Sequence, residues 1–415
     1  MRVFLTLGLF LCVAACGGDG SGEAGAQQNL FGADLVVERI AVPSAAGSGQ
    51  AHLVSINSQV LLSWLEPVGE SERALRYAML DSSGSWTEPV TVAVRERFFV
   101  NWADFPSVVP ISESLWVSHW LELQPDSYGA YDAVVAVSTD AGNSWTDGEK
   151  LNEDQTVAEH GFVEIFSTEN GARALWLDGR EMANWSFDNP EQLLGVSLRS
   201  ASVEPSGAVV DRQIVDPMVC DCCQPDVVAS NGQPILVYRD RSEEEIRDIA
   251  IRRSLDGAWE EARNIGGEGW MIEGCPVNGP AIAASEDDIH VAWFTAEGQN
   301  PRVRYAASAD SAGTFSDPID IDADGALGQV DVVAVDGGGA WLTWWRRGVN
   351  GGIDLVLGSV SPEGMSNELL VVASEDVSQP VDVPQLQPLE DGLVVVWTSF
   401  EGDGMLKAAR VEVAN

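Results

Sequence analysis

The chain has 415 residues, of which 45% are hydrophobic, so it can bury a large core and is not a disordered protein. Its 64 acidic residues outnumber its 23 lysines and arginines, for a formal net charge of −41. A protein of this charge repels phosphate backbones, so we expect no nucleic-acid partner. The only lysines are Lys150 and Lys407, and the other basic residues are arginines, which suit bidentate contacts with carboxylates.

The N-terminus has the pattern of an export signal. One arginine, Arg2, precedes an apolar run that ends in small residues before Cys16, and this run is too short to span a membrane permanently. The segment Val13-Ala14-Ala15-Cys16 resembles the bacterial lipobox, which implies cleavage before Cys16 and lipidation of this cysteine. We therefore expect a signal peptide at 1–15, a flexible tether at 16–31 and a folded domain at 32–415.

This interpretation predicts a lipid-anchored protein of the bacterial cell envelope. Gly17 rather than an aspartate follows Cys16, so we expect the outer membrane, on its periplasmic or surface side. Contact with the membrane would be made only by the lipid, since no later run is apolar enough for a transmembrane helix. The alternative is an ordinary secreted protein in which Cys16 has no special role.

Short apolar strands that end in an aromatic residue recur along the folded part. Successive aromatic residues are 51 to 62 positions apart. A period of this length, with strands and turns but no helical periodicity, predicts an all-β fold and a β-propeller. The recurring aromatic residues are Trp64, Trp120, Trp176, Tyr238, Trp293, Trp344 and Trp397.

Seven such strands predict a single domain of seven blades. After the last one there is room for only one more strand, at 405–413, so the last blade lacks its fourth strand. We expect the N-terminal segment 33–42 to supply this strand by pairing with the C-terminal strands. Such pairing closes the ring and removes the open edge of the last blade. Because no strand edge is then left open for pairing with another chain, we expect a monomer.

The turns between third and fourth strands carry a resemblance to a known family. Residues 138–145, Ser-Thr-Asp-Ala-Gly-Asn-Ser-Trp, resemble the Asp box of sialidases and related propellers, and weaker copies lie at 81–86, 254–259 and 308–315. In such a turn the carboxylate caps its own turn and glycine supplies a positive φ. The whole mature chain therefore resembles the sialidase-like superfamily, as a divergent subgroup with a Cys-Asp-Cys-Cys loop. Sialidases have six blades, so six is the alternative count.

The resemblance also implies an arginine triad for a substrate carboxylate. In sialidases an Arg-Ile-Pro motif near the first blade opens this triad. The segment Arg39-Ile40-Ala41-Val42-Pro43 is an imperfect match to the motif, and it lies in the expected closing strand.

The loops of a propeller divide between two faces. Asp-box turns lie on one face, whereas links from second to third strand and from blade to blade lie on the other, where propeller ligands bind. The chemically unusual residues of the sequence map to this second face. They are Asp104, Glu159, His160, Asp178, Arg180, Cys220, Cys222, Cys223, Arg239, Asp240, Glu245, Arg247, Cys275 and Arg346.

Several of these residues are candidates for binding an acidic sugar. Arg180, Arg239 and Arg346 come from three blades, as an arginine clamp for a carboxylate requires. Further substrate contacts are assigned to His160, Asp178, Asp240 and Arg247. The alternative is that the arginine–aspartate pairs are salt bridges that tie neighbouring strands together.

Four residues are candidates for catalysis of glycoside hydrolysis. Tyr238 would be the nucleophile, with Glu245 or Glu159 as its base, although its place in the aromatic series equally suits packing. Asp104 is the acid/base candidate, because Trp102 nearby would raise its pKa by desolvation. His160 is either a ligand or proton-transfer group or an ordinary hydrogen-bonded histidine.

Four cysteines fall in the folded part, namely Cys220, Cys222, Cys223 and Cys275. Outside the cytoplasm an even number favours two disulfides, one joining Cys275 to the cluster and one within Cys-Asp-Cys-Cys. The alternative is a zinc or copper(I) site made by the four thiolates. We expect no other cofactor, and no calcium loop of the D-x-D-x-D-G type is evident.

Two functions remain open from the sequence. The first is an envelope lipoprotein that binds acidic glycans or, if it is an enzyme, hydrolyses them as a sialidase-like glycoside hydrolase. The second is a non-catalytic scaffold that binds an envelope protein, a metal or a redox partner through its cysteine-rich face.

Overall fold

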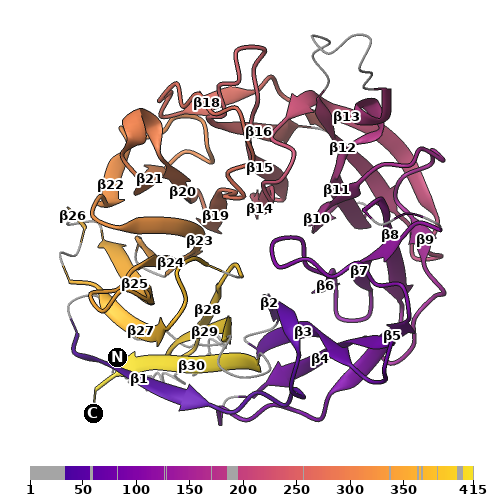
Figure 1. Ribbon diagram of the computed structural model, residues 1–415, viewed down its shortest axis with the longest axis horizontal. Helices are drawn as coiled ribbons and strands as arrows, with labels where there is room; N and C mark the ends of the chain where they lie inside the picture. Colours follow the sequence, from indigo (N-terminus) through magenta and orange to yellow (C-terminus); the bar gives the residue numbers. More distant parts are fainter. Residues whose placement is uncertain are drawn as a thin grey trace, which may run out of the picture.

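The computed structural model describes residues 33–414, with gaps at 57–58, 82, 126, 128, 170, 185–194, 256, 336–337, 362–363, 366–367, 381 and 400–404. The expected signal peptide, Cys16 and the tether lie outside the described residues. Within them, seven β-sheets form a ring around a central channel (Figure 1). The prediction of an all-β propeller with seven blades is confirmed, and the alternative of six is wrong. No described helix is long and apolar enough to cross a membrane.

Each blade runs from a first strand beside the channel to an outer strand at the rim. Blades 1 to 3 are built from β2 (Gly49–Ile56), β3 (Gln59–Pro67), β4 (Arg73–Leu80) and β5 (Val90–Arg95); β6 (Ser107–Pro110), β7 (Trp116–Leu123), β8 (Tyr131–Ser138) and β9 (Glu149–Lys150); and β10 (His160–Thr168), β11 (Gly171–Asp178), β12 (Val196–Val203) and β13 (Val209–Val219). A 3-10 helix, η1 (Arg180–Asn184), follows β11.

Blades 4 to 6 repeat this plan, with the outer strand divided in two in blades 4 and 6. They are built from β14 (Asp226–Ser230), β15 (Gln233–Arg239), β16 (Ile249–Leu255), β17 (Ala258–Trp259) and β18 (Arg263–Ile265); β19 (Ala281–Ser285), β20 (Asp288–Thr295), β21 (Arg302–Ser308) and β22 (Ile319–Asp322); and β23 (Ala326–Ala334), β24 (Ala340–Arg347), β25 (Ile353–Ser361), β26 (Gly364–Met365) and β27 (Leu370–Glu375). A short 3-10 helix, η2 (Glu297–Gln299), follows β20.

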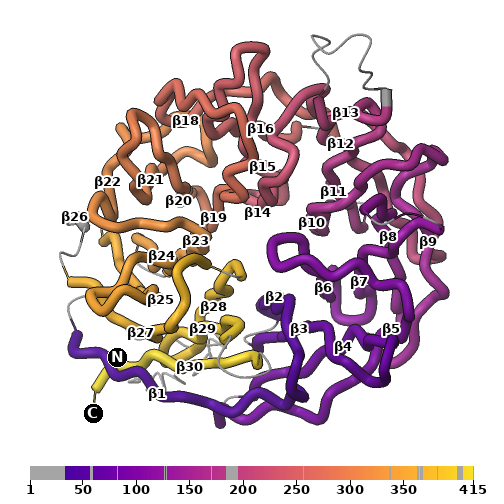
Figure 2. The backbone as a smooth tube through the Cα atoms, in the orientation of Figure 1, coloured from indigo at the N-terminus to yellow at the C-terminus, as the bar shows by residue number. Residues whose placement is uncertain are grey.

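Blade 7 combines both ends of the chain. It consists of β28 (Gln385–Leu389), β29 (Gly392–Ser399) and β30 (Met405–Val413), with β1 (Leu35–Ile40) as the outer strand. Leu35 pairs with Val413, and Ile40 with Ala408. Figure 2 shows the indigo start and yellow end of the chain running side by side. The expected closure of the ring by the N-terminal strand is therefore confirmed.

The seven aromatic residues that revealed the repeat form the core between blades. Each of them is at most 1% exposed. Burying an indole or phenol removes a polar N–H or O–H from water, so each needs a hydrogen-bond partner inside the protein. The partner is a carboxylate in every blade.

An arginine completes this arrangement, which we call the aromatic–carboxylate–arginine unit. In blade 6, Trp344 Nε1 donates to Asp322 Oδ2 at 2.9 Å, and Arg346 Nε donates to the same oxygen at 3.0 Å. In the other blades the arginine likewise pairs with the carboxylate or lies over the aromatic ring. The remaining units are Trp64 with Glu66 and Arg76; Trp120 with Glu122 and Arg95; Trp176 with Asp178 and Arg180; Tyr238 with Asp216 and Arg252; Trp293 with Glu268 and Arg304; and Trp397 with Glu375 and Arg39.

The carboxylate of the unit comes from one of two places. In blades 1 to 3 it follows the aromatic residue by two positions on the same strand, as Glu66 follows Trp64. In blades 4 to 7 it comes from the outer part of the preceding blade or from the link that follows it, as Asp322 of β22 reaches Trp344 of β24. In these four blades the unit therefore ties one blade to the next.

Closure of the ring can be tested by removing β1. A chain that starts at Pro43 lacks the half-buried Leu35, Val37 and Ile40, and exposes the edge of β30. We expect its free energy of unfolding to fall by about 3 kcal/mol or more, and the chain to aggregate through the open edge. Urea unfolding should show this against a control chain that starts at Ala33. Equal midpoints for the two chains would contradict the closure.

The unit can be tested in blade 5. Glu268 is buried and accepts from Trp293 Nε1 and Arg304 Nη1, both at 2.9 Å. Glu268→Ala leaves the buried indole N–H of Trp293 without its acceptor and removes one of the two carboxylates that pair with Arg304, so we expect a loss of about 2–3 kcal/mol in the free energy of unfolding. Asp320 pairs with the same arginine but is 45% exposed, and Asp320→Ala should cost about 1 kcal/mol or less. Similar losses for the two variants would refute a structural role for the unit.

Candidate functional site

The predicted arginine clamp is not assembled at one open site. Arg346 pairs with Asp322 in the unit of blade 6. Arg180 lies in blade 3, where its guanidinium contacts three carboxylates. Arg239 is 1% exposed and donates to backbone carbonyls of blades 4 and 5. Arg180 and Arg346 are thus paired with carboxylates, as in the salt-bridge alternative, whereas Arg239 is held by backbone carbonyls.

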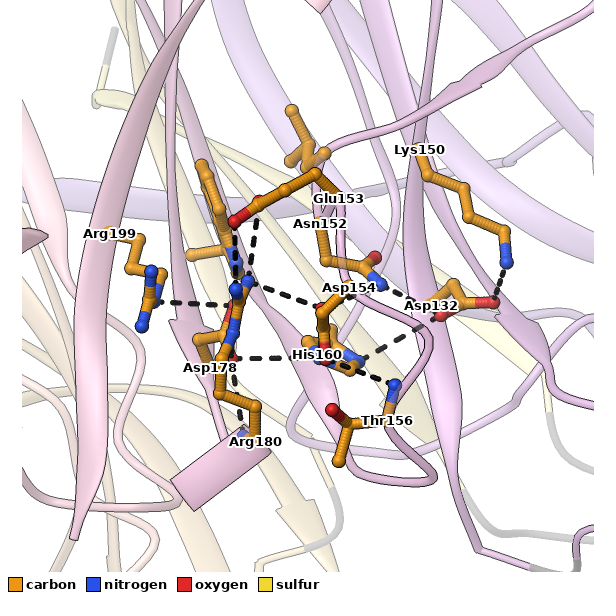
Figure 3. A network of polar contacts seen from close by, with 12 residues as sticks. Asp132, Lys150, Asn152, Glu153, Asp154, Thr156, His160, Asp178, Arg180 and Arg199 are labelled. Atoms are coloured by element: carbon orange, nitrogen blue, oxygen red, sulfur yellow. Dashed lines mark hydrogen bonds and ion pairs between the residues drawn. The ribbon is translucent and has the colours of Figure 1, made fainter. Parts of the chain in front are cut away.

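Figure 3 shows the surroundings of Arg180. Its guanidinium lies 2.6 Å from Asp178, 2.8 Å from Glu153 and 3.2 Å from Asp154. Buried His160 faces the same carboxylates, with Nε2 at 3.3 Å from Asp154 and 3.6 Å from Asp178. Asp154, His160 and Asp178 have the ligand types and proximity for a metal ion. The guanidinium of Arg180 already supplies the positive charge between the two aspartates, so we read the cluster as an ion-pair network.

Tyr238 belongs to the unit of blade 4. Its hydroxyl donates to Asp216 at 2.7 Å and accepts from Arg252 at 3.0 Å. Burial, together with the charge of Asp216, raises the pKa of this phenol far above its ordinary value, which opposes its use as a nucleophile. Of its proposed bases, Glu245 is paired with Arg241 and Arg247 instead.

Glu159 lines a pocket of about 370 Å³. We call this the blade-3 pocket, because the start of β10, the end of β11 and η1 form most of it. Its apolar wall includes Phe162, Leu177 and Met182. Glu159 and Asp221 supply carboxylates to the lining. The pocket lies on the face of blade-to-blade links, where propeller ligands bind.

The two carboxylates of the blade-3 pocket have different electrostatic settings. Partial desolvation, with the charge of Asp221, raises the pKa of Glu159 above its usual range. Asp221 accepts from Arg247 Nη1 at 2.7 Å. The pocket therefore combines a carboxyl whose pKa is raised with one that is paired with an arginine.

Asp104 lies directly behind the pocket. It is 1% exposed, and it accepts from the Phe162 amide at 2.8 Å and the Tyr131 hydroxyl at 3.1 Å. Burial raises its pKa to about 7. Trp102, which was expected to shield Asp104 from water, is itself 37% exposed. The groups in contact with the Asp104 carboxylate are Phe162 of blade 3 and Tyr131 of blade 2. A side chain at Gly161 would collide with the Asp104 carboxylate and the Tyr131 ring, so the glycine is required there.

Tyr131 and Asp221 are pocket residues that sequence reasoning missed. Asp221 carried a signal, because it stands between the cysteines of the Cys-Asp-Cys-Cys loop. Tyr131 begins a third strand and carried none. Asp240 was predicted as a substrate contact, but the structure places it beside Asp248 and Arg241 rather than in the blade-3 pocket.

The central channel holds a second set of acidic residues that the sequence analysis did not single out. Glu164, Asp226 and Asp331 line this space of about 360 Å³. Burial raises the pKa of Asp226 to about 6 and that of Asp331 to about 7. Asp226 accepts from the Ile282 amide and Asp331 from the Leu386 amide. These two carboxyls thus tie the first strand of one blade to that of the next.

The cysteines link the loops that enter blades 4 and 5. Cys222 and Cys275 form a disulfide. Cys220 and Cys223 are buried free cysteines with Sγ atoms 2.7 Å apart. Arg247 Nη1 lies 3.5 Å from Cys220 Sγ and also holds Asp221, so the cysteine cluster adjoins the blade-3 pocket.

No protein-family model matches this sequence, and no curated protein matches it. Solved propeller structures do match. The BP39L lectin from Burkholderia pseudomallei has a TM-score of 0.56 and 12% identity, over 90% of this chain and 97% of the lectin. A PL25 ulvan lyase has a TM-score of 0.54 and 11% identity, over 90% of this chain and 96% of the lyase.

Sialidases are among the matched structures, with lower similarity. The NanB sialidase from Streptococcus pneumoniae has a TM-score of 0.43 and 13% identity, over 89% of this chain and 69% of the sialidase. At 11–12% identity, the likeness to the lectin and the lyase shows the propeller fold and nothing finer.

The buried carboxyls predict how stability depends on pH. Asp104, Asp331 and Asp382 have folded-state pKa values of about 7, above the ordinary value near 4. Folding therefore favours their protonated form, and the stability that they contribute is lost as the pH rises through 7. We expect the urea midpoint, and with it the free energy of unfolding, to fall between pH 6 and pH 8. In Asp104→Asn the fall in the free energy of unfolding over this range should be smaller by about 1 kcal/mol.

The control for this experiment is Glu88→Gln, in the exposed segment between β4 and β5 on the opposite face. It should leave the pH dependence unchanged. A midpoint that is flat from pH 6 to pH 8 in the wild type would show that these carboxyls are ionised in the folded protein.

Proposed function

We propose that this propeller binds a carbohydrate in the blade-3 pocket, and that the sugar is neutral or carries an amino group. The observation that carries the proposal is the pocket itself, with an apolar wall next to two carboxylates on the linking face. Sugars present C–H faces to apolar walls and hydroxyl groups to acceptors. A volume of about 370 Å³ is within the range of small-ligand sites.

The charge of the pocket argues against an acidic sugar. The described lining of the pocket holds the carboxyl groups of Glu159 and Asp221 and no lysine or arginine, and Arg247 beside Asp221 is already paired with Asp221 and Glu245. A sugar carboxylate would meet repulsion here rather than a clamp. An amino or hydroxyl group of a sugar would instead donate a hydrogen bond to the carboxyl oxygens of Asp221.

The similar structures support a carbohydrate ligand only by analogy. One is a lectin, and the ulvan lyase was solved with a sugar chain bound. The proposal includes the envelope location and the lipid on Cys16, which rest on the sequence pattern of residues 1–16. The whole would be a lectin-like protein held at the cell surface or in the periplasm.

Glycoside hydrolysis is the second candidate function, favoured by the two unlike carboxyls of the pocket. Glu159, with its raised pKa, has the property of a general acid. Asp221, which pairs with Arg247 at 2.7 Å, would be the nucleophile or would stabilise an oxocarbenium ion. Paired carboxyls of this kind perform glycosidase chemistry without a metal or cofactor.

A glycan array followed by calorimetry on the full folded domain tests the proposal. We expect neutral or amino glycans to bind and sialylated ones not to bind. Glu159→Gln and Asp221→Asn should each weaken binding at least about tenfold, because each removes a hydrogen bond to a charged group. The control Glu88→Gln should bind as the wild type does.

Two results would overturn the proposal. One is absence of binding to every glycan class. The other is binding of sialylated glycans that survives both pocket substitutions, since the ligand would then occupy another surface. Chromogenic glycosides of the sugar that binds, and a chromogenic sialoside, separate hydrolysis from binding: release that is lost in both variants identifies an enzyme.

A further inference from the structure

The four cysteines of the folded domain lie within reach of one another. Cys220, Cys222 and Cys223 follow β13, and Cys275 lies in the link before β19. Cys222 is bonded to Cys275, and Cys220 Sγ lies 3.9 Å from Cys222 Sγ. A buried thiol is therefore in contact with one sulfur of a disulfide, while its other neighbour, Cys223, is a second thiol at 2.7 Å.

Two arginines, Arg239 and Arg247, place positive charge near the Cys220 thiol. Among the described residues, Arg239 makes its three hydrogen bonds with carbonyl oxygens and none with a carboxylate. Its guanidinium also lies over the Trp270 ring, 4.9 Å from the ring centroid, and its charge lowers the pKa of the Cys220 thiol. Arg247 approaches Cys220 Sγ to 3.5 Å. A buried guanidinium without a carboxylate needs a nearby anion, and a thiolate at Cys220 would meet this need.

The ionisation of the two thiols differs accordingly. Burial opposes ionisation of Cys220, but the hydrogen bond with Cys223 and the charges of Arg239 and Arg247 outweigh it and lower the pKa of this thiol. Burial raises the pKa of Cys223. Since the thiolate is the nucleophile in thiol–disulfide exchange, Cys220 is placed to attack and Cys223 to act second.

We propose that these cysteines form a thiol–disulfide exchange site, in which one disulfide moves between Cys222–Cys275 and Cys220–Cys223. The Cys220 thiolate attacks Cys222 Sγ, the bond to Cys275 breaks, and Cys275 leaves as a thiolate that takes up a proton. Cys223 then loses its proton and attacks Cys220 Sγ, which releases Cys222 as a second thiolate that is protonated in turn. One disulfide is broken for each one formed, so the exchange needs no oxidant or reductant.

The two positions of the disulfide have different consequences for the surface. Cys222–Cys275 crosslinks the loops that enter blades 4 and 5. Cys220–Cys223 is buried within one loop, and it leaves Cys275, which is exposed, as a free thiol on the linking face. Exchange thus presents a reactive thiol to a partner that carries a disulfide, which the Cys275 thiolate can attack with release of one partner thiolate. This site stands whether or not the blade-3 pocket binds a sugar.

Disulfide mapping tests the exchange. The purified chain is equilibrated at graded ratios of reduced to oxidised dithiothreitol, quenched with acid, alkylated with N-ethylmaleimide and analysed as peptides by mass spectrometry. We expect the form with two free thiols to contain both pairings, and alkylation at neutral pH to trap Cys275. In Cys220→Ser the trapping of Cys275 should slow at least tenfold.

Arginine variants provide a matched comparison that leaves all cysteines in place. Arg247→Gln removes a charge beside Cys220 and should slow the trapping of Cys275 several-fold. Arg253→Gln is its control, since Arg253 lies in the same blade and pairs with Glu260; it should leave the rate unchanged. Circular dichroism of each variant confirms the fold.

Three results would overturn the proposal. The first is that the form with two free thiols has a single disulfide pairing at every dithiothreitol ratio. The second is that the disulfides are reduced only when the protein unfolds, as structural crosslinks would be. The third is that the purified protein holds one zinc or copper ion per chain, with all four cysteines protected from alkylation. The last result would identify a metal site in place of the exchange site.

Discussion

The structure depends on a carboxylate that is shared between a buried aromatic residue and an arginine. An indole N–H that is packed between blades needs an acceptor, and a buried acceptor with negative charge needs a cation, so the three groups stabilise one another. The unit places the second strand of each blade, and in blades 4 to 7 it also joins that blade to the one before. It uses seven of the few arginines of an acidic chain. The blade-3 pocket, by contrast, is lined by Glu159 and Asp221 and by no arginine among the described residues.

The sequence was sufficient to predict the ring because its period is carried by large buried residues. Trp64 and its six counterparts end the second strands at near-constant spacing, and the missing fourth strand of the last blade indicated that β1 would close the ring. The aromatic–carboxylate–arginine unit could not be predicted in the same way. Glu66 follows its tryptophan by two positions, whereas Glu375 precedes Trp397 by 22 and belongs to another blade, so no fixed spacing reveals the carboxylate.

The sequence was sufficient to predict which face of the propeller holds the candidate site, but not which residues form it. Sorting loops by their place in the blade grouped the unusual residues correctly, but a face that spans seven blades is far wider than a site. Which arginine is free depends on burial and on partners from adjacent blades, as Arg239 and Arg346 show. Asp104, Tyr131, Glu159 and Asp221 meet because four separate segments converge beside blade 3, and this convergence follows from the tilt and packing of strands that periodicity does not encode.

The closing pair of strands also determines how the ring responds to force. Leu35 at the start of β1 pairs with Val413 at the end of β30, so both ends leave the blade at the same point (Figure 1). Pulling the two ends apart loads the hydrogen bonds between β1 and β30 one after another, in the unzipping geometry, rather than all at once, as in the shear geometry. The other six blades bear no load until β1 has detached. The same outer ladder that completes the ring is therefore its mechanical weak point, and tension on the N-terminal side would be relieved there first.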